Sequence, residues 1–188
     1  METTKKYELT SETIKFNDVT LHRIKALKDF SYVKAGDLGG WIEKEDNLSQ
    51  SGDAWVFGNA KVYDNAIVSD NAIIYGNAII YGNAKVYGRA KVYDNAEICG
   101  YAEIFENAEV FGDAEIYDNA VVFDNAKVYD DAMCSGNAQV FGSSVVYGYA
   151  NVRGDAKVYG RAKVYDNAVV CGDIKIFGNS RVCGDSYL

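Results

Sequence analysis

The sequence predicts an all-β fold, a single-stranded parallel β-helix, from its composition and from the spacing of its residues. Proline is absent, whereas glycine (18 residues) and tyrosine (15 residues) are abundant, which suits regular β structure better than disorder. Residues 51–188 form 23 six-residue repeats, 138 residues in all, without one insertion. Each repeat has one aliphatic and one small position, so we expect short strands coiled into a solenoid.

The aliphatic position defines the core. Every sixth residue from 56 to 188 is Val, Ile or Leu in 22 of 23 repeats, the exception being Cys134. A helix is excluded because steps of six residues place successive aliphatics about 240° apart around a helical wheel. In a strand such as Lys61-Val62-Tyr63, the central residue points inward and its neighbours outward. The aliphatic side chains are therefore expected to line the axis of the coil.

The remaining positions of the repeat predict tight corners. Every sixth residue from 54 to 168 is Ala in 19 of 20 repeats, with Ser144 as the exception. Pairs such as Gly58-Asn59 and Asp64-Asn65 stand between the outward strand residue and the next alanine. Gly, Asp and Asn tolerate left-handed backbone conformations, and Asp and Asn also bond their own turns. Each repeat is thus one strand followed by one corner.

Outward aromatic residues recur at intervals of 18, the length of a coil that contains three repeats. Two columns are continuous: Phe57, Tyr75, Tyr93, Phe111, Tyr129, Tyr147 and Tyr165; and Tyr87, Phe105, Phe123, Phe141, Tyr159 and Phe177. A third column begins with Tyr63 and Tyr81 but is broken in its C-terminal half, so we expect it to face solvent. The two continuous columns are candidate ladders of stacked rings.

Two interpretations of the ladders stay open. Stacked rings stabilise neighbouring coils by about 0.5–1.5 kcal/mol per pair beyond area burial. Large exposed apolar patches also mark interaction sites, and the neighbouring positions Trp55, Ile67 and Ile73 are expected to add apolar area. The ladders are therefore candidates both for stabilising the coil and for contacting a protein partner or a second copy.

The net charge of −8 argues against nucleic acid or an anionic membrane as a partner. Residues 94–131 contain eleven acidic residues against one lysine, and among them Glu97, Glu103, Glu109 and Glu115 form a candidate acidic belt. Basic residues precede and follow this stretch. The simpler interpretation is a solvated surface, and the alternative is lateral docking of a basic zone against the belt.

Residues 1–50 lack the six-residue pattern and are expected to form a capping module for the solenoid of residues 51–188. Alternation around Asn17-Asp18 predicts a β-hairpin that lies over the first ring of strands and blocks that edge. No apolar run follows the N-terminus, so neither a signal peptide nor a transmembrane helix is expected. Four dispersed cysteines fit free thiols in a reducing compartment, so we expect a cytoplasmic protein.

The sequence also resembles a known family. The V-Y-G-N-A and V-Y-D-N-A repeats are similar to the hexapeptide signature of left-handed β-helix proteins. Residues 23–60, with Gly39-Gly40-Trp41 and Asn47-Leu48-Ser49, resemble the N-terminal module of YdcK-like hexapeptide-repeat proteins. The resemblance implies a left-handed helix of seven to eight triangular coils. It also implies a transferase label that this family takes from the fold it shares with hexapeptide acyltransferases, and fold alone is weak support for activity.

The residues themselves do not favour an enzyme. Hexapeptide acyltransferases use a histidine base and inserted loops, whereas His22, the sole histidine, lies in the capping module and the repeats contain no insertion. Neither a P-loop nor a dinucleotide fingerprint occurs, and no acidic cluster has metal-ligand spacing. We therefore expect no catalytic residue, no cofactor and no metal.

The function predicted from the sequence is a non-catalytic structural or self-assembling β-solenoid that acts as a protein-interaction scaffold. Ile174, Tyr187 and Leu188 lie at the C-terminal end, where open strand edges are expected. A homodimer is predicted, formed either by stacking of these ends or along an aromatic face. The alternatives are an acyltransferase-like enzyme and an acidic binding module of phage or defence origin.

Overall fold

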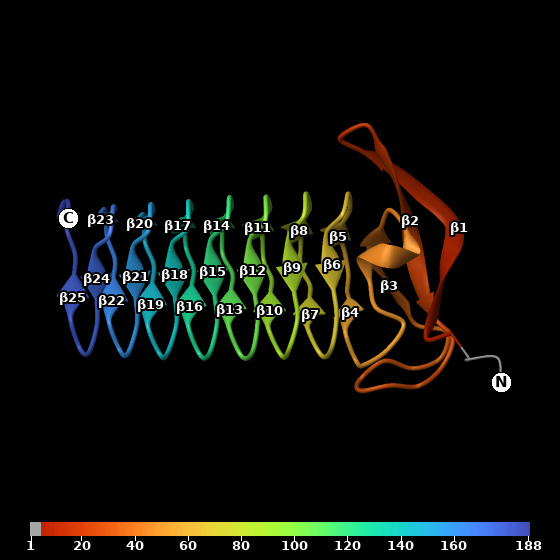
Figure 1. The fold of residues 1–188 in the computed structure, drawn as a ribbon. Helices are drawn as coiled ribbons and strands as arrows, with labels where there is room; N and C mark the ends of the chain where they lie inside the picture. Colours follow the sequence, from red (N-terminus) through yellow and green to blue (C-terminus); the bar gives the residue numbers. More distant parts are fainter. Residues whose placement is uncertain (1–4) are drawn as a thin grey trace.

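A computed structural model describes residues 5–188 as a straight rod with a β-sheet cap at its N-terminal end (Figure 1). The rod is a parallel β-solenoid of about eight turns, with three short strands in each turn. Strands three apart in sequence are neighbours in space, so each side of the rod is one sheet. Two hydrogen-bonded residues per strand suffice because every rung is paired with the rungs before and after it.

The three sheets define three faces, which we number for later use. Face 1 contains β3 (Leu38–Ile42), β5 (Lys61–Val62), β8 (Ile79–Ile80), β11 (Glu97–Ile98), β14 (Glu115–Ile116), β17 (Met133–Cys134), β20 (Asn151–Val152) and β23 (Val169–Val170). Face 2 contains β4 (Trp55–Val56), β7 (Ile73–Ile74), β10 (Lys91–Val92), β13 (Glu109–Val110), β16 (Lys127–Val128), β19 (Val145–Val146), β22 (Lys163–Val164) and β25 (Arg181–Val182). Face 3 contains β6 (Ile67–Val68), β9 (Lys85–Val86), β12 (Glu103–Ile104), β15 (Val121–Val122), β18 (Gln139–Val140), β21 (Lys157–Val158) and β24 (Lys175–Ile176).

The core runs along the axis of the rod as the repeat predicts. The inward aliphatic residues and the corner alanines form one continuous buried cluster from the cap to Val182. The two exceptions to the pattern are also buried. Burial raises the pKa of the Cys134 thiol to about 12, and the Ser144 hydroxyl donates to the Phe141 and Val158 carbonyls at 2.8 and 3.1 Å. Each substitute is therefore accommodated without an unpaired polar group.

The cap begins with the predicted hairpin, β1 (Tyr7–Phe16) and β2 (Val19–Ala26), joined by Asn17 and Asp18 in left-handed conformation. Its position differs from the expectation. The hairpin does not lie across the strand edges, because β2 pairs antiparallel with β3 and β3 pairs parallel with β5. The hairpin therefore continues the sheet of face 1, and the 27–37 loop covers the end of the core, where Val33 is buried.

Parallel pairing begins inside the range expected to be the cap. Ile42 pairs with Val62, and Leu48, just after the 3-10 helix Glu45–Asn47, bridges to Val68. Both partners are 20 residues apart (62 − 42 and 68 − 48), whereas later rungs are 18 apart, as when Val62 pairs with Ile80. A two-residue surplus conceals this first turn from the six-residue pattern. Whether residues 1–50 and 51–188 are separate units stays a prediction.

The all-β solenoid predicted from the repeat is confirmed. Within residues 5–188, no helix has the length and apolar character needed to cross a lipid bilayer.

Candidate interaction surfaces

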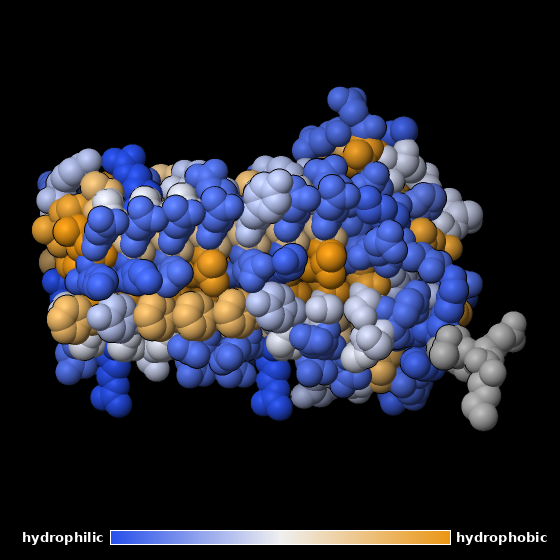
Figure 2. Space-filling view, in the orientation of Figure 1, coloured by the Kyte–Doolittle hydropathy of each residue, from blue (hydrophilic) through white to orange (hydrophobic). Residues whose placement is uncertain are grey.

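Both predicted aromatic ladders are present as stacks of nearly parallel rings. On face 2 the stack runs from Tyr75 to Tyr165 with ring centroids 4.6–5.1 Å apart. On face 3 it runs from Tyr87 to Phe177 with centroids 4.8–5.6 Å apart. Figure 2 shows a straight row of mostly apolar side chains along the rod, bordered by polar residues. Each ring covers the face of the next, so solvent meets mainly ring edges.

The start of each aromatic column departs from the prediction because the cap covers it. Trp55, expected to face outward, is 1% exposed and meets the rings of Tyr7 and Phe30 edge to face. Phe57 likewise meets the Trp55 ring edge-on, at 6.5 Å between centroids. Tyr63, at the head of the column expected to face solvent, is 5% exposed beneath the hairpin. The hairpin therefore shields the first turns of the rod.

The corners contain a contact that the sequence reading missed. Aspartates in left-handed conformation accept a hydrogen bond from the backbone N–H of the glycine 18 residues later, as from Gly142 to Asp124 at 2.9 Å. The same pair recurs from Gly88 to Asp70 at 3.0 Å and in five other places. Reading the corner residues at intervals of 18, instead of six, would have revealed the Asp-to-Gly order.

The candidate acidic belt encircles the rod and is partly neutralised. Glu97 and Glu115 are neighbours on face 1, whereas Glu103 lies on face 3 and Glu109 on face 2. Lys85 Nζ lies 3.0 Å from Glu103 Oε1, and Glu109 stands between Lys127 at 2.8 Å and Lys91 at 3.6 Å. The hydrogen bond from Lys127 is the main cause that lowers the pKa of Glu109. The four carboxylates thus do not form one acidic face.

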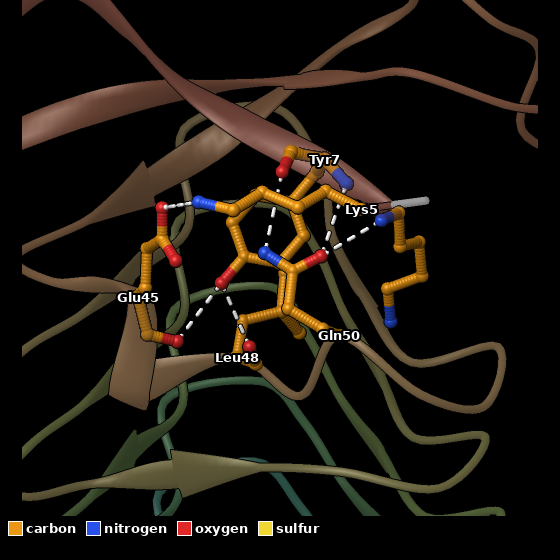
Figure 3. A network of polar contacts seen from close by, with 6 residues as sticks. Lys5, Tyr7, Glu45, Leu48 and Gln50 are labelled. Atoms are coloured by element: carbon orange, nitrogen blue, oxygen red, sulfur yellow. Dashed lines mark hydrogen bonds and ion pairs between the residues drawn. The ribbon is translucent and has the colours of Figure 1, made fainter. Parts of the chain in front are cut away.

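At the N-terminal end, polar side chains satisfy the backbone of the first turn (Figure 3). The Tyr7 hydroxyl lies 2.9 and 2.7 Å from the Glu45 and Leu48 carbonyl oxygens, and the Gln50 side-chain amide pairs with the Tyr7 backbone. The pKa of the Tyr7 hydroxyl is raised, mainly by burial. These contacts hold β1 against the segment that enters the solenoid.

Lys6 is the other half of this arrangement. Its side chain is fully buried, and its ammonium donates to the Ala54 carbonyl at 2.9 Å and to the Gly52 carbonyl at 3.4 Å. Within the solenoid, N–H groups donate to carbonyls of the following turn, so the first turn presents carbonyls without donors. Lys6 supplies those donors. Burial lowers the pKa of Lys6 to about 8.

The C-terminal residues extend face 1 by one rung. Tyr187 forms a parallel bridge with Val169, and Leu188 exchanges backbone hydrogen bonds of 2.9 Å with Val169 and Cys171. Ile174, Tyr187 and Leu188 are all exposed. No further strand pairs with the outer edges of β24 and β25 in the part of the chain that is described. That this end stacks on a second copy stays a prediction.

Groups with catalytic potential are dispersed. His22 lies on β2 opposite Ile42, with its Nδ1 3.4 Å from the Thr10 carbonyl. The four cysteines are free, and Cys99 has a raised pKa, chiefly because of burial. Across residues 5–188, no three His, Cys, Asp or Glu side chains converge as metal ligands do.

Together, the uninterrupted repeat, the corner alanines and the stacked sheets define a hexapeptide-repeat β-solenoid. Residues 60–76 match the family model described as the YdcK β-solenoid repeat. A stretch of 61 residues is 38% identical to the "uncharacterized acetyltransferase YdcK" of Escherichia coli (strain K12), covering 28% of this chain and 19% of that protein. The resemblance to YdcK-like hexapeptide-repeat proteins is thus confirmed, over less than two thirds of the relative's length.

Proposed function

We propose that this chain is a non-catalytic structural β-solenoid, able to self-assemble, that acts as a rigid scaffold for protein interaction. The observation that carries the proposal is the unbroken stack of turns. The backbone is paired from rung to rung, and corner contacts link each turn to the next. Such a rod holds outward side chains in straight rows at the spacing of β-strands, about 4.8 Å.

The outer surface supports a binding role more than a catalytic one. Catalysis requires several groups that converge in a site shielded from water. The rows on this rod diverge around three faces, and the acidic residues among them are distributed over all three. His22 packs in the cap sheet against backbone atoms.

Acetyl transfer is the competing function, favoured by the printed name of the E. coli relative. The test is calorimetric titration with acetyl-coenzyme A at millimolar concentration, together with a thiol assay for released coenzyme A in the presence of amine and sugar acceptors. We expect neither heat nor release. Saturable binding with turnover would overturn the non-catalytic proposal, and a His22→Ala variant would then show whether the histidine takes part.

A cytoplasmic location accompanies this proposal. It is supported by the four free cysteines, of which Cys183 is exposed and Cys99 and Cys171 are half-buried. Exposed free thiols persist in reducing compartments and become oxidised elsewhere. Alkylation of these thiols in intact cells followed by mass spectrometry tests the location, because oxidised cysteines would contradict it.

A further inference from the structure

The two aromatic ladders differ in what surrounds their centres. On face 2 the central ring, Phe111, is flanked by tyrosines, and the neighbouring strand positions are Lys91, Glu109 and Lys127. On face 3 the three central rings are Phe105, Phe123 and Phe141, and the neighbouring strand positions include Val121 and Gln139. We call these three rings with Val121 the Phe patch. It is apolar and uncharged at its centre, as the core of a protein interface is.

The stacking limits what can bind the Phe patch. Ring planes on face 3 differ by only 4–7° from Tyr87 to Tyr159, and neighbouring centroids are 4.8–5.0 Å apart. A partner therefore meets ring edges that repeat at the spacing of stacked strands. A surface that matches this repeat over several rungs is another stack of parallel strands. A second copy of this chain presents such a surface.

We propose that the chain forms an antiparallel dimer through face 3, with the two-fold axis at Phe123. A two-fold interface must be complementary to itself. The rungs read Tyr87, Phe105, Phe123, Phe141 and Tyr159, an order that is the same in both directions. The axis sets Phe123 against its own copy and Phe105 against Phe141 of the other copy. This proposal rests on the proposed function and specifies the partner.

Charge complementarity supports the same arrangement. On face 3, Glu103 lies 3.0 Å from Lys85, while Lys157 has no carboxylate within 4.0 Å among residues 5–188. The two-fold axis brings Lys157 of the second copy to within one rung of Glu103, so Glu103 lies between two lysines. Face 2 shows this arrangement within one chain, where Glu109 lies between Lys91 and Lys127.

The available area suffices. A standard interface buries about 800 Å² on each partner. The chain exposes 8914 Å², so such an interface takes roughly 9% of the surface (800/8914), less than one of the three faces of the rod.

Val121→Lys is the decisive variant, since lysine already occupies the equivalent strand position in β9, β16 and β21 and the fold accepts it there. The matched control is Val145→Lys, at the same strand position on face 2. Sedimentation equilibrium at about 100 µM should give a dimer for the parent chain and for Val145→Lys. Val121→Lys should be monomeric, with an unchanged circular dichroism spectrum.

The orientation is tested by spin-label distances in a background with Cys99, Cys171 and Cys183 replaced by Ser. A label at Asn125→Cys lies near the axis and should give a short distance between copies. A label at Asn71→Cys lies three rungs from the axis, so the two labels should be separated along the rod by about 29 Å, six rungs of ~4.8 Å.

A monomeric parent chain, a dimer that Val121→Lys leaves intact, or short distances from both labels would overturn the proposal. A dimer that is lost on Leu188→Lys and kept in Val121→Lys would do so too, and would indicate end stacking instead. None of these outcomes touches the non-catalytic function, which the acetyl-coenzyme A titration decides separately.

Discussion

The cap and the solenoid bury their chain by different means. In the solenoid, each contact is repeated in turn after turn, so every inward Val or Ile has a similar environment. In the cap, single residues make contacts that occur once: Lys6 donates to the first-turn carbonyls and Trp55 packs against Tyr7 and Phe30. Stability in the solenoid is therefore distributed, whereas the cap depends on a few side chains.

The largest effect should come from breaking the centre of the cap. Trp55→Ala removes a buried ring that touches three aromatic neighbours, so we expect a loss of about 3–5 kcal/mol in the free energy of unfolding. Urea denaturation followed by circular dichroism measures it. Phe177→Ala, at a ladder ring that is 57% exposed, serves as control and should cost under about 1 kcal/mol. Equal losses would show that the cap is not special.

Equivalence between turns is the next test. Ile104→Ala and Ile116→Ala each remove a fully buried side chain from the axis, on different faces. Each should cost about 2–5 kcal/mol. Because the surroundings repeat, the two losses should agree to within about 1 kcal/mol in urea unfolding. A larger discrepancy would mean that stability is not shared evenly along the rod.

A smaller effect separates corner strain from contact between turns. Gly160 and Gly178 occupy the same corner column with φ of 75° and 65°. An added Cβ at Gly160 would lie 2.9 Å from the Gly178 backbone nitrogen, whereas at Gly178 nothing lies within 4 Å. Both alanine variants should lose about 1 kcal/mol from the left-handed conformation. Thermal unfolding should show a further loss in Gly160→Ala alone, and equal melting temperatures would refute the contact.

The smallest effect concerns pH and the cap. The pKa of Lys6 is lowered to about 8 from 10.5, so between these values the unfolded chain binds more protons than the folded one. Stability from this group therefore rises with pH across that window, by at most about 1.4 kcal/mol per unit. The difference in unfolding free energy between the parent and Lys6→Met should grow from pH 8 to 10. A difference that stays constant or shrinks would contradict the burial of this amine.

The repeat explains why the solenoid was predictable and the cap was not. A period of six fixes the inward Val62 and corner Ala60 regardless of tertiary detail, and a period of 18 predicts the stacking of Phe105 on Phe123. The contacts of Lys6 join residues 48 apart and occur once, so no pattern announces them. The handedness of the coil also does not follow from spacing. The two-residue surplus before Val56 hid the first turn for the same reason.

The aspartate-to-glycine contacts restrict the lengths that this rod can adopt. Deleting residues 97–102, one repeat, would bring Asp118 to the place of Gly112, directly above Asp94, so that two carboxylates would meet where one now accepts an N–H. The same deletion would set Ser135 in place of Tyr129 and interrupt the ring stack. Removal of 18 residues returns every column to its own face. Growth and shortening by duplication should therefore proceed in whole turns, as in a screw thread whose pitch cannot be divided.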